Sequence, residues 1–326
     1  MYSKDPKENE LIAEKIQALA DKYEASGQSL VSYLEGLLHA DYLTYWNYSR
    51  IDTLLTLQTP RTAIPDEMIF IIYHQITELY FKAIIWEMEQ VVSDNALSDE
   101  TFLTKLGRVT RYLKHLVHSF DVMVDGMAPE QFLKFRMSLL PASGFQSAQY
   151  RQIEIFSTDL INLVEHEQRP RFNEQTSVAE MYGSIYWKRG ATEMSTGKKT
   201  LTLTQFEEKY SDLLVNLAQR CKNNNLYAIF RNRFQDSPQK DSIKSELRNL
   251  DALLNIDWCL SHYKSAVRYL ARAEKSVEAT GGTNWQQYLP PRFQRIIFYP
   301  ELWSDDEKEE WGKSWVVANV GYRLIK

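Results

Sequence analysis

The chain has 326 residues, of which 44% are hydrophobic and 25% are charged, the balance of a soluble globular protein with ample material for a core. Its formal net charge of −5 gives no reason to expect a nucleic acid or an anionic membrane as a partner. Only 12 glycines and 10 prolines occur, which favours a chain dominated by helices.

The cysteine pattern and the first residues of the chain indicate the cellular compartment in which we expect the protein. Cys221 and Cys259 form neither a CxxC pair nor a disulfide framework, which is typical of a reducing cytoplasm. The start of the chain, MYSKDPKENE, is charged and lacks the apolar segment of a signal peptide. We expect no run to reach the length of a membrane span. A cytoplasmic protein is therefore predicted.

The N-terminal part begins with an amphipathic pattern. Residues 7–24 predict a helix that ends at Ser26-Gly27. In the segment that follows, residues 33–58, Tyr45 and Tyr48 lie three positions apart and therefore share a helix face. By spacing alone, such a pair is typical of an aromatic packing stripe.

A long helix is predicted to begin at Pro65-Asp66-Glu67, because acidic residues in the first turn are favoured by the helix dipole. Phe70 and His74 lie four residues apart on this helix, on neighbouring faces. A single histidine in such a pattern is more often a core residue than a functional one.

The stretch from Phe132 to Phe156 combines a backbone break with many polar side chains. Another helix, predicted over 99–125, precedes it. The chain should break at Leu140-Pro141 and restart as a helix after Ser143-Gly144. This pattern fits either a packed helical corner or a site. The polar side chains are Arg136, Ser143, Gln146, Ser147 and Gln149.

Residues 166–245 are the least informative part of the chain. The segment Trp187–Lys199 predicts a loop, helical periodicity returns over residues 206–220, and a helix should begin at or after Ser237-Pro238. We find no internal repeat and no GxGxxG, P-loop or HExxH motif in the sequence.

The last informative region predicts a helix over residues 251–274. It carries Trp258 and His262 four residues apart, with Cys259 as a small core residue. The pair Gly281-Gly282 that follows fits a turn, or a place where the backbone approaches a ligand closely.

Several segments together resemble one family. They are DEMIFIIYHQITELYFK, FRMSLLPASGFQSAQYRQIE, WCLSHYKSAVR and ATGGTNWQQYL, in that order along the chain. They are similar to the signatures of the tryptophan 2,3-dioxygenases, a family of haem-dependent enzymes. The resemblance implies an all-α fold in which a helical bundle encloses a haem pocket, with a homotetrameric assembly. It also implies one domain, residues 1–326, whose N-terminal part, residues 1–60, is exchanged into a neighbouring subunit.

The resemblance also implies roles for particular side chains, with haem b as the cofactor and O2 as the co-substrate. Tyr45 and Tyr48 would cover the pocket of an adjacent chain. The other expected contacts are Phe70 against the indole ring, His74 as acceptor of the indole N–H, Arg136 on the carboxylate, Thr280 near the ammonium group and His262 as the axial ligand of the haem iron. An imidazole is a common axial donor to haem.

This sequence departs from the family pattern at several positions. Phe132 stands where a tyrosine commonly adds a hydrogen bond to the carboxylate, and Ser49 stands where an apolar residue is usual. Ala279 replaces a glycine, and Trp285 adds bulk to a loop that is usually small. The interval from His262 to Thr280 is about one helical turn longer than in the shorter members of the family. The loop is therefore expected to lie differently over the pocket.

The expected reaction is the cleavage of the indole ring of L-tryptophan, or of a related indole amino acid, by O2 to give N-formylkynurenine. Two alternatives stay open. A haem enzyme of the same superfamily could insert one oxygen atom to give an oxindole or rearrange the ring, which Phe132 and Trp285 favour. A helical protein that binds haem or tryptophan without turnover is the more distant alternative.

Overall fold

The structure is a computed structural model that describes residues 4–40, 44–139, 144–192, 198–270 and 290–313. Over these residues the chain is all-α, with two isolated β-bridges, Val164 to Ile185 and Thr192 to Lys199. The predicted fold class is confirmed. The chain divides into two compact units, Met1–Gln58 and Thr59–Lys326, which are described separately below. That the whole chain acts as one domain stays a prediction.

The first unit contains four helices and no core of its own. The N-terminal helix, predicted over residues 7–24, begins at Pro6 because Asp5 accepts a hydrogen bond from the Lys7 backbone N–H. No residue of these helices is buried, and several large apolar side chains are exposed. The helices are α1 (Pro6–Glu24), α2 (Leu30–Leu38), α3 (Tyr45–Ser49) and α4 (Ile51–Leu54).

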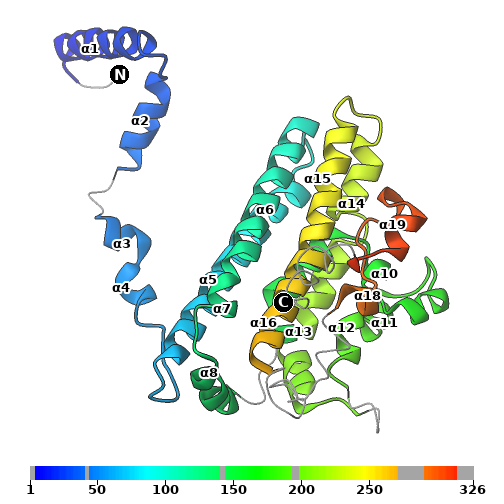
Figure 1. Cartoon of the computed structure of the whole chain (residues 1–326). Helices are drawn as coiled ribbons and strands as arrows, with labels where there is room; N and C mark the ends of the chain where they lie inside the picture. Colours follow the sequence, from blue (N-terminus) through cyan, green and yellow to red (C-terminus); the bar gives the residue numbers. More distant parts are fainter. Residues whose placement is uncertain (1–3, 41–43, 140–143, 193–197, 271–289, 314–326) are drawn as a thin grey trace. The chain divides into compact units, whose positions relative to one another are not determined.

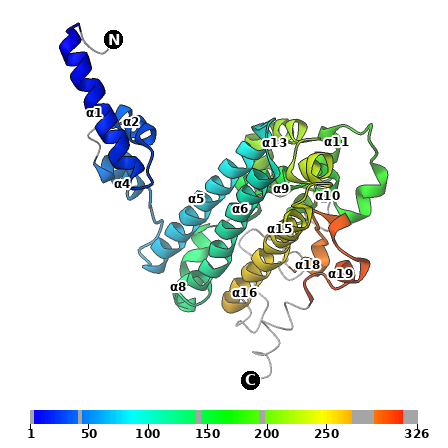
Figure 2. The same ribbon diagram turned by 90° about the horizontal axis from the view of Figure 1, so that it is seen from above.

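The second unit is a bundle whose long helices α5, α6 and α15 run side by side (Figures 1 and 2). Short helices and 3-10 turns connect them. In chain order the elements up to residue 171 are α5 (Asp66–Ser93), α6 (Asp99–Ser119), α7 (Asp121–Val124), α8 (Pro129–Phe135), η1 (Arg136–Leu139), η2 (Gly144–Gln146), α9 (Ala148–Ser157), α10 (Leu160–Leu163) and η3 (His166–Arg171).

The remaining elements of the second unit include two π-helical turns, η4 and η5. In chain order, the elements described after residue 171 are α11 (Val178–Gly183), α12 (Tyr186–Arg189), α13 (Leu201–Arg220), α14 (Leu226–Ile229), η4 (Phe230–Phe234), α15 (Lys240–Ala252), η5 (Leu253–Asp257), α16 (Trp258–Leu270), α18 (Pro291–Gln294), η6 (Pro300–Leu302) and α19 (Asp305–Glu309).

The helix α5 is the central scaffold of this unit, and its inner face packs against α6 and α9. Phe81, Ile84 and Met88 are almost completely buried there. By length and composition α5 could also cross a membrane, so the expectation that no run reaches that length is wrong by this criterion. A core helix passes the same test, and nine residues of α5 are buried.

Three helix boundaries differ from the sequence prediction. The helix predicted over 99–125 is divided at Phe120 into α6 and α7. The restart after the break is a 3-10 turn, and α9 begins only after Ser147, whose side chain accepts from the Tyr150 N–H. The helix predicted from residue 251 begins at Lys240 and continues through the π turn η5 into α16.

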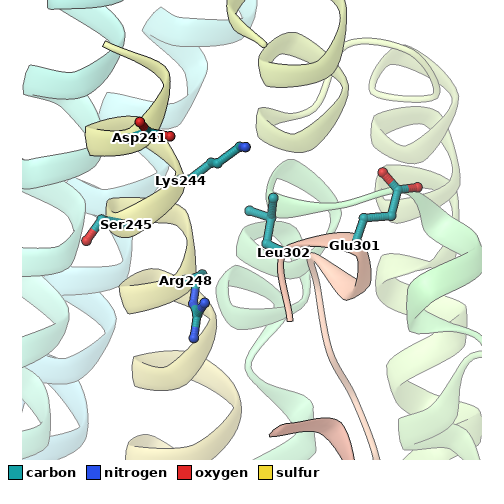
Figure 3. A pocket seen from close by; sticks show the side chains of 6 residues that line it. All are labelled: Asp241, Lys244, Ser245, Arg248, Glu301 and Leu302. Atoms are coloured by element: carbon teal, nitrogen blue, oxygen red, sulfur yellow. The ribbon is translucent and has the colours of Figure 1, made fainter. Parts of the chain in front are cut away.

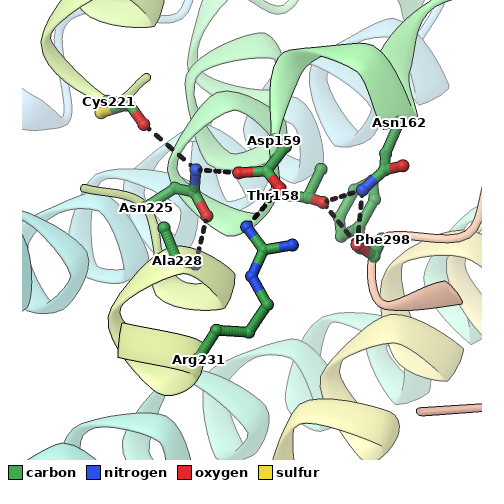
Figure 4. Close-up of polar contacts among 8 residues, drawn as sticks. All are labelled: Thr158, Asp159, Asn162, Cys221, Asn225, Ala228, Arg231 and Phe298. Atoms are coloured by element: carbon green, nitrogen blue, oxygen red, sulfur yellow. Dashed lines mark hydrogen bonds and ion pairs between the residues drawn. The ribbon is translucent and has the colours of Figure 1, made fainter. Parts of the chain in front are cut away.

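Buried polar groups hold the C-terminal segment against the bundle. The Phe298 carbonyl accepts from Thr158 Oγ1 and from Asn162 Nδ2 (Figure 4). The N–H of the same residue donates to the buried carboxylate of Asp251 at 3.0 Å. Because both backbone groups of Phe298 are satisfied by side chains from α9–α10 and α15, the segment has one defined position.

Candidate functional site

The predicted site residues that the structure describes in the second unit lie on three segments of the chain that pack together. The helix α5 carries Phe70 and His74, α8 and η1 carry Phe132 and Arg136, and α16 carries His262. The helix α8 contacts both α5 and α16. Three segments far apart in the sequence therefore bring their predicted residues to one region of the bundle.

Phe70 lies at the centre of an aromatic cluster on the α5 side. Its ring centre is 4.1 Å from that of His74, 5.6 Å from that of Phe135 and 6.2 Å from that of Phe132. Phe132 packs in turn on Tyr269, with ring centres 4.5 Å apart. Flat apolar surfaces of this kind suit an aromatic ligand.

The tautomer of His74 follows from one contact. Its Nδ1 lies 2.7 Å from the Phe70 carbonyl oxygen, which can only accept, so Nδ1 carries the proton. Burial by the surrounding protein lowers the pKa of His74, although part of the ring remains accessible to solvent. The ring is therefore neutral near pH 7, and Nε2 is a hydrogen-bond acceptor.

His262 is held between two aromatic rings. The ring centres of Phe120 and Trp258 lie 4.8 Å and 5.3 Å away, and both rings are steeply inclined to the imidazole. Burial, and to a smaller extent nearby His74, lower the pKa of His262 to about 4. A neutral imidazole is the form that binds a metal ion.

Gly144 leaves room beside the His262 ring. A Cβ atom added at Gly144 would lie 3.8 Å from Nε2 of His262. A larger side chain at this position would extend towards the nitrogen that an iron atom would need. The geometry of the donor and the space beside it therefore fit an axial ligand of haem.

Arg136 is 5% exposed, and burial lowers the pKa of its guanidinium. A buried guanidinium keeps its charge and is stabilised by a carboxylate or by several acceptors. Arg136 directly follows α8 and lies one helical turn beyond Phe132, a member of the aromatic cluster. The pair combines an apolar surface with a cation, as an aromatic amino acid requires.

The predicted contacts of three other residues are not tested by the structure. Tyr45 and Tyr48 lie on α3 in the first unit, with exposed fractions of 73% and 79%. Thr280 lies outside the described residues, as do Ala279 and Trp285. Their predicted contacts stay predictions.

Much of the polar character of the 143–154 stretch has a structural explanation. Gln149 donates from Nε2 to both the backbone oxygen and the carboxylate of Glu78, each at 2.8 Å, and so connects α9 to α5. Arg151 and Glu154 form a buried ion pair, and Tyr186 donates to that carboxylate. These contacts join helices rather than face the aromatic cluster.

Sequence reasoning missed three residues of the site. Phe120, Phe135 and Tyr269 contact the predicted residues, and the Tyr269 hydroxyl donates to the Val124 carbonyl. Only their aromatic character could have indicated them, and aromatic residues are common throughout this chain. A separate surface pocket between α15 and η6 is lined mainly by polar residues and contains none of the predicted site residues (Figure 3).

Comparisons with known proteins agree with this arrangement. A family model described as tryptophan 2,3-dioxygenase matches residues 34–177. A tryptophan 2,3-dioxygenase of Herpetosiphon aurantiacus is 29% identical over 270 residues, which cover 80% of this chain and 96% of that protein. The chain is similar to the tryptophan 2,3-dioxygenases over most of its length. The resemblance inferred from the sequence motifs is confirmed.

Other tryptophan 2,3-dioxygenases give the same result with different coverage. The protein of Polaromonas naphthalenivorans is 27% identical over 268 residues, or 80% of this chain and 90% of that protein. The protein of Anaeromyxobacter sp. is 41% identical over 117 residues, or 36% of this chain and 44% of that protein.

Proposed function

We propose that this chain is a cytoplasmic haem-dependent oxygenase that cleaves the indole ring of L-tryptophan with O2 to give N-formylkynurenine. One observation carries the proposal. His74, with Nδ1 hydrogen-bonded to the Phe70 carbonyl, offers a free Nε2 beside an aromatic cluster, and His262 lies on a second helix, close enough to His74 for their charges to interact.

His262 would hold haem b as the axial ligand. Its imidazole is neutral, two aromatic rings fix its orientation, and Gly144 leaves space next to Nε2. The bound haem would supply the activation of O2. Buried apolar side chains around His262 exclude water from this side of the site.

The substrate would be bound at both ends. The indole ring would lie against Phe70 and donate its N–H to Nε2 of His74, and Arg136 would bind the carboxylate in a bidentate way. By family resemblance Thr280 would lie near the ammonium group. With Nδ1 protonated, a neutral His74 would orient the ring by accepting the indole N–H at Nε2.

The site would be completed by a neighbouring chain. The first unit buries none of its residues, and its apolar side chains need cover that the unit itself does not provide. This supports an N-terminal unit that is exchanged between subunits, with Tyr45 and Tyr48 over the pocket of the neighbour. A homotetramer is the assembly that we propose from the family.

Phe132 favours a second candidate, a related haem enzyme that adds one oxygen atom to tryptophan or to a derivative. The ring of Phe132 packs on Tyr269 and carries no hydroxyl to hold the substrate carboxylate. A more loosely held carboxylate would allow a different position of the indole over the cofactor. A binding protein without turnover is the third candidate.

The test is to add haemin to the purified chain, reduce it, and analyse the product formed from L-tryptophan in air by mass spectrometry. We expect haem absorption and a product that contains two additional oxygen atoms. One added atom would favour the second candidate, and none the third. His262→Ala should lose the haem spectrum, whereas His115→Ala, at an exposed position on α6, should keep it. A wild-type protein that stays colourless would refute the proposal.

A further inference from the structure

A short segment at the start of α5 contacts both ends of the element that carries Phe132 and Arg136. This segment, residues 61–66, follows the first unit and ends at the first residue of α5, and we call it the strap. The element that it contacts is α8 with η1, which follow each other without a gap over residues 129–139. The helices α8 and α5 pack against each other (Figure 1).

The strap caps the N-terminal end of α8. Ala128, the N-cap residue, donates its backbone N–H to the Asp66 carboxylate at 2.7 Å. In return, the Asp66 backbone N–H donates to the side-chain oxygen of Gln131 at 3.2 Å. The first N–H groups of a helix lack partners within the helix, and a negative charge is favoured at this end of the helix dipole. Asp66 supplies both the acceptor and the charge.

The strap also caps the other end of the same element. The Arg61 guanidinium donates to the Ser138 carbonyl at 3.0 Å. Carbonyl groups in the last turn of a helix lack partners within the helix, and a cation is favoured there. Because η1 is a single 3-10 turn, it has few hydrogen bonds of its own. One segment therefore places a carboxylate and a guanidinium at the two helix ends that each of them stabilises.

A buried carboxylate holds the strap itself in place. Glu67, which is 1% exposed, accepts the backbone N–H groups of Arg61 at 2.8 Å and of Thr62 at 2.7 Å. Burial raises the pKa of Glu67, but these bonds and that from the Thr62 hydroxyl outweigh it and lower the pKa below its usual value. Because the backbone of Arg61 is fixed, its side chain loses less conformational entropy when it binds Ser138.

We propose that Arg61 and Asp66 are positioning residues for the substrate carboxylate. They hold the two ends of the α8–η1 element, and through its backbone they keep Arg136 in place. This inference rests on the proposed function, because it takes Arg136 as the group that binds the carboxylate. Neither positioning residue touches the substrate. Loss of the strap contacts therefore weakens the grip on the carboxylate and leaves the indole contacts with α5 intact.

The first experiment measures hydrogen exchange of the full chain by mass spectrometry, and it needs neither haem nor turnover. In Arg61→Ala, peptides over residues 132–139 should exchange about 2- to 12-fold faster than in wild type, because one hydrogen bond is lost. Arg61→Lys keeps a donor and a positive charge and should stay close to wild type. Arg111→Ala is the matched control, because Arg111 is exposed on α6. Unchanged exchange in Arg61→Ala would overturn the proposal.

Asp66 is tested in the same way at the other end of the element. Asp66→Ala should accelerate the exchange of peptides over residues 128–132 by about 2- to 12-fold. Asp66→Asn keeps a side-chain oxygen that accepts from the Ala128 N–H, so its exchange should rise less. If Asp66→Ala exchanges at the wild-type rate, Asp66 does not hold this end and its assignment is wrong.

The second experiment compares L-tryptophan with tryptamine, which lacks the carboxylate. Arg61→Ala should raise the KM for L-tryptophan by about 2- to 12-fold at nearly constant kcat, and leave both constants for tryptamine unchanged. Arg61→Lys should recover most of the affinity, and Arg111→Ala should have no effect. Equal losses for both substrates would reveal a general structural role and contradict the proposal. If wild type oxidises neither substrate, the proposed function fails, while hydrogen exchange still decides whether the strap positions α8–η1.

The third experiment tests whether Arg61 acts through Arg136. Arg61→Ala and Arg136→Lys are combined, and kcat/KM for L-tryptophan is compared with the values for the single variants. If Arg61 acts by placing the Arg136 guanidinium, the loss caused by Arg61→Ala should largely disappear in the Arg136→Lys background. Losses that multiply in full would mean that the two residues act independently, and Arg61 would then not be a positioning residue for Arg136.

Discussion

His74 offers a direct test of the proposed substrate site. Substitution of His74 by Phe keeps a planar ring beside Phe70, whose ring centre lies 4.1 Å away, and removes the free acceptor Nε2. One hydrogen bond contributes about 0.5–1.5 kcal/mol net. Wild type should therefore prefer L-tryptophan over its benzothiophene analogue, which has sulfur in place of the indole N–H, by about 2- to 12-fold in kcat/KM. The variant should show no preference.

The assay compares the two substrates within each protein, so that differences in haem content or oxygen binding cancel in the ratio. His115→Phe is the control, because His115 is exposed on α6 and should leave the wild-type ratio unchanged. The reasoning fails if His74→Phe keeps the wild-type preference for L-tryptophan. It also fails if wild type itself does not distinguish the two substrates.

Three further predictions concern the carboxylate grip and the buried acid. Phe132→Tyr should lower the KM for L-tryptophan by about 2- to 12-fold, because the hydroxyl adds one hydrogen bond to the carboxylate. The KM for tryptamine, which has no carboxylate, should not change. Arg136→Lys loses the bidentate geometry and should lower kcat/KM for L-tryptophan by about 10- to 100-fold, again without an effect on tryptamine. Burial raises the pKa of Asp251 from 3.8 to about 6, so the folded state takes up its proton more readily than the unfolded chain. Relative to Asp251→Asn, wild type should therefore gain about 2 kcal/mol of stability as the pH falls from 6 to 4, measured by urea unfolding at both values.

The helices with strong local signals could be predicted from the sequence. The start of α1 follows from Asp5 and Pro6, and the start of α5 from the acidic residues after Pro65, because capping and the helix dipole act within one turn. The serine that caps α9 could not be chosen in the same way. Ser143 and Ser147 both precede the helix. Because the 3-10 turn Gly144–Gln146 comes before α9, the residue at the N-terminus of the helix is Ser147.

The sequence predicted the candidate site only in part. The motifs indicated His74, Arg136 and His262, but periodicity alone could not separate functional polar residues from structural ones. Gln149 and Arg151 look equally suggestive in the sequence. Yet Gln149 donates to Glu78 on α5, and Arg151, which also pairs with Glu154 on its own helix, donates to Tyr186 on α12. Such partners lie far away in the chain, so local pattern contains no information about them.

The position of His262 shows most clearly where local reasoning stops. The helix that carries it begins at Lys240 and passes through the π turn η5, which contains one more residue per turn than an α-helix. Without that turn, every side chain of α16 would be rotated by about 100° relative to α15. The Leu254 carbonyl in the turn accepts from the hydroxyl of Tyr150 at 3.0 Å, a residue of α9 more than a hundred positions earlier. The direction of the proposed iron ligand therefore depends on a contact between distant segments. A sequence motif can identify the ligand, but helical periodicity does not reveal the contact that orients it.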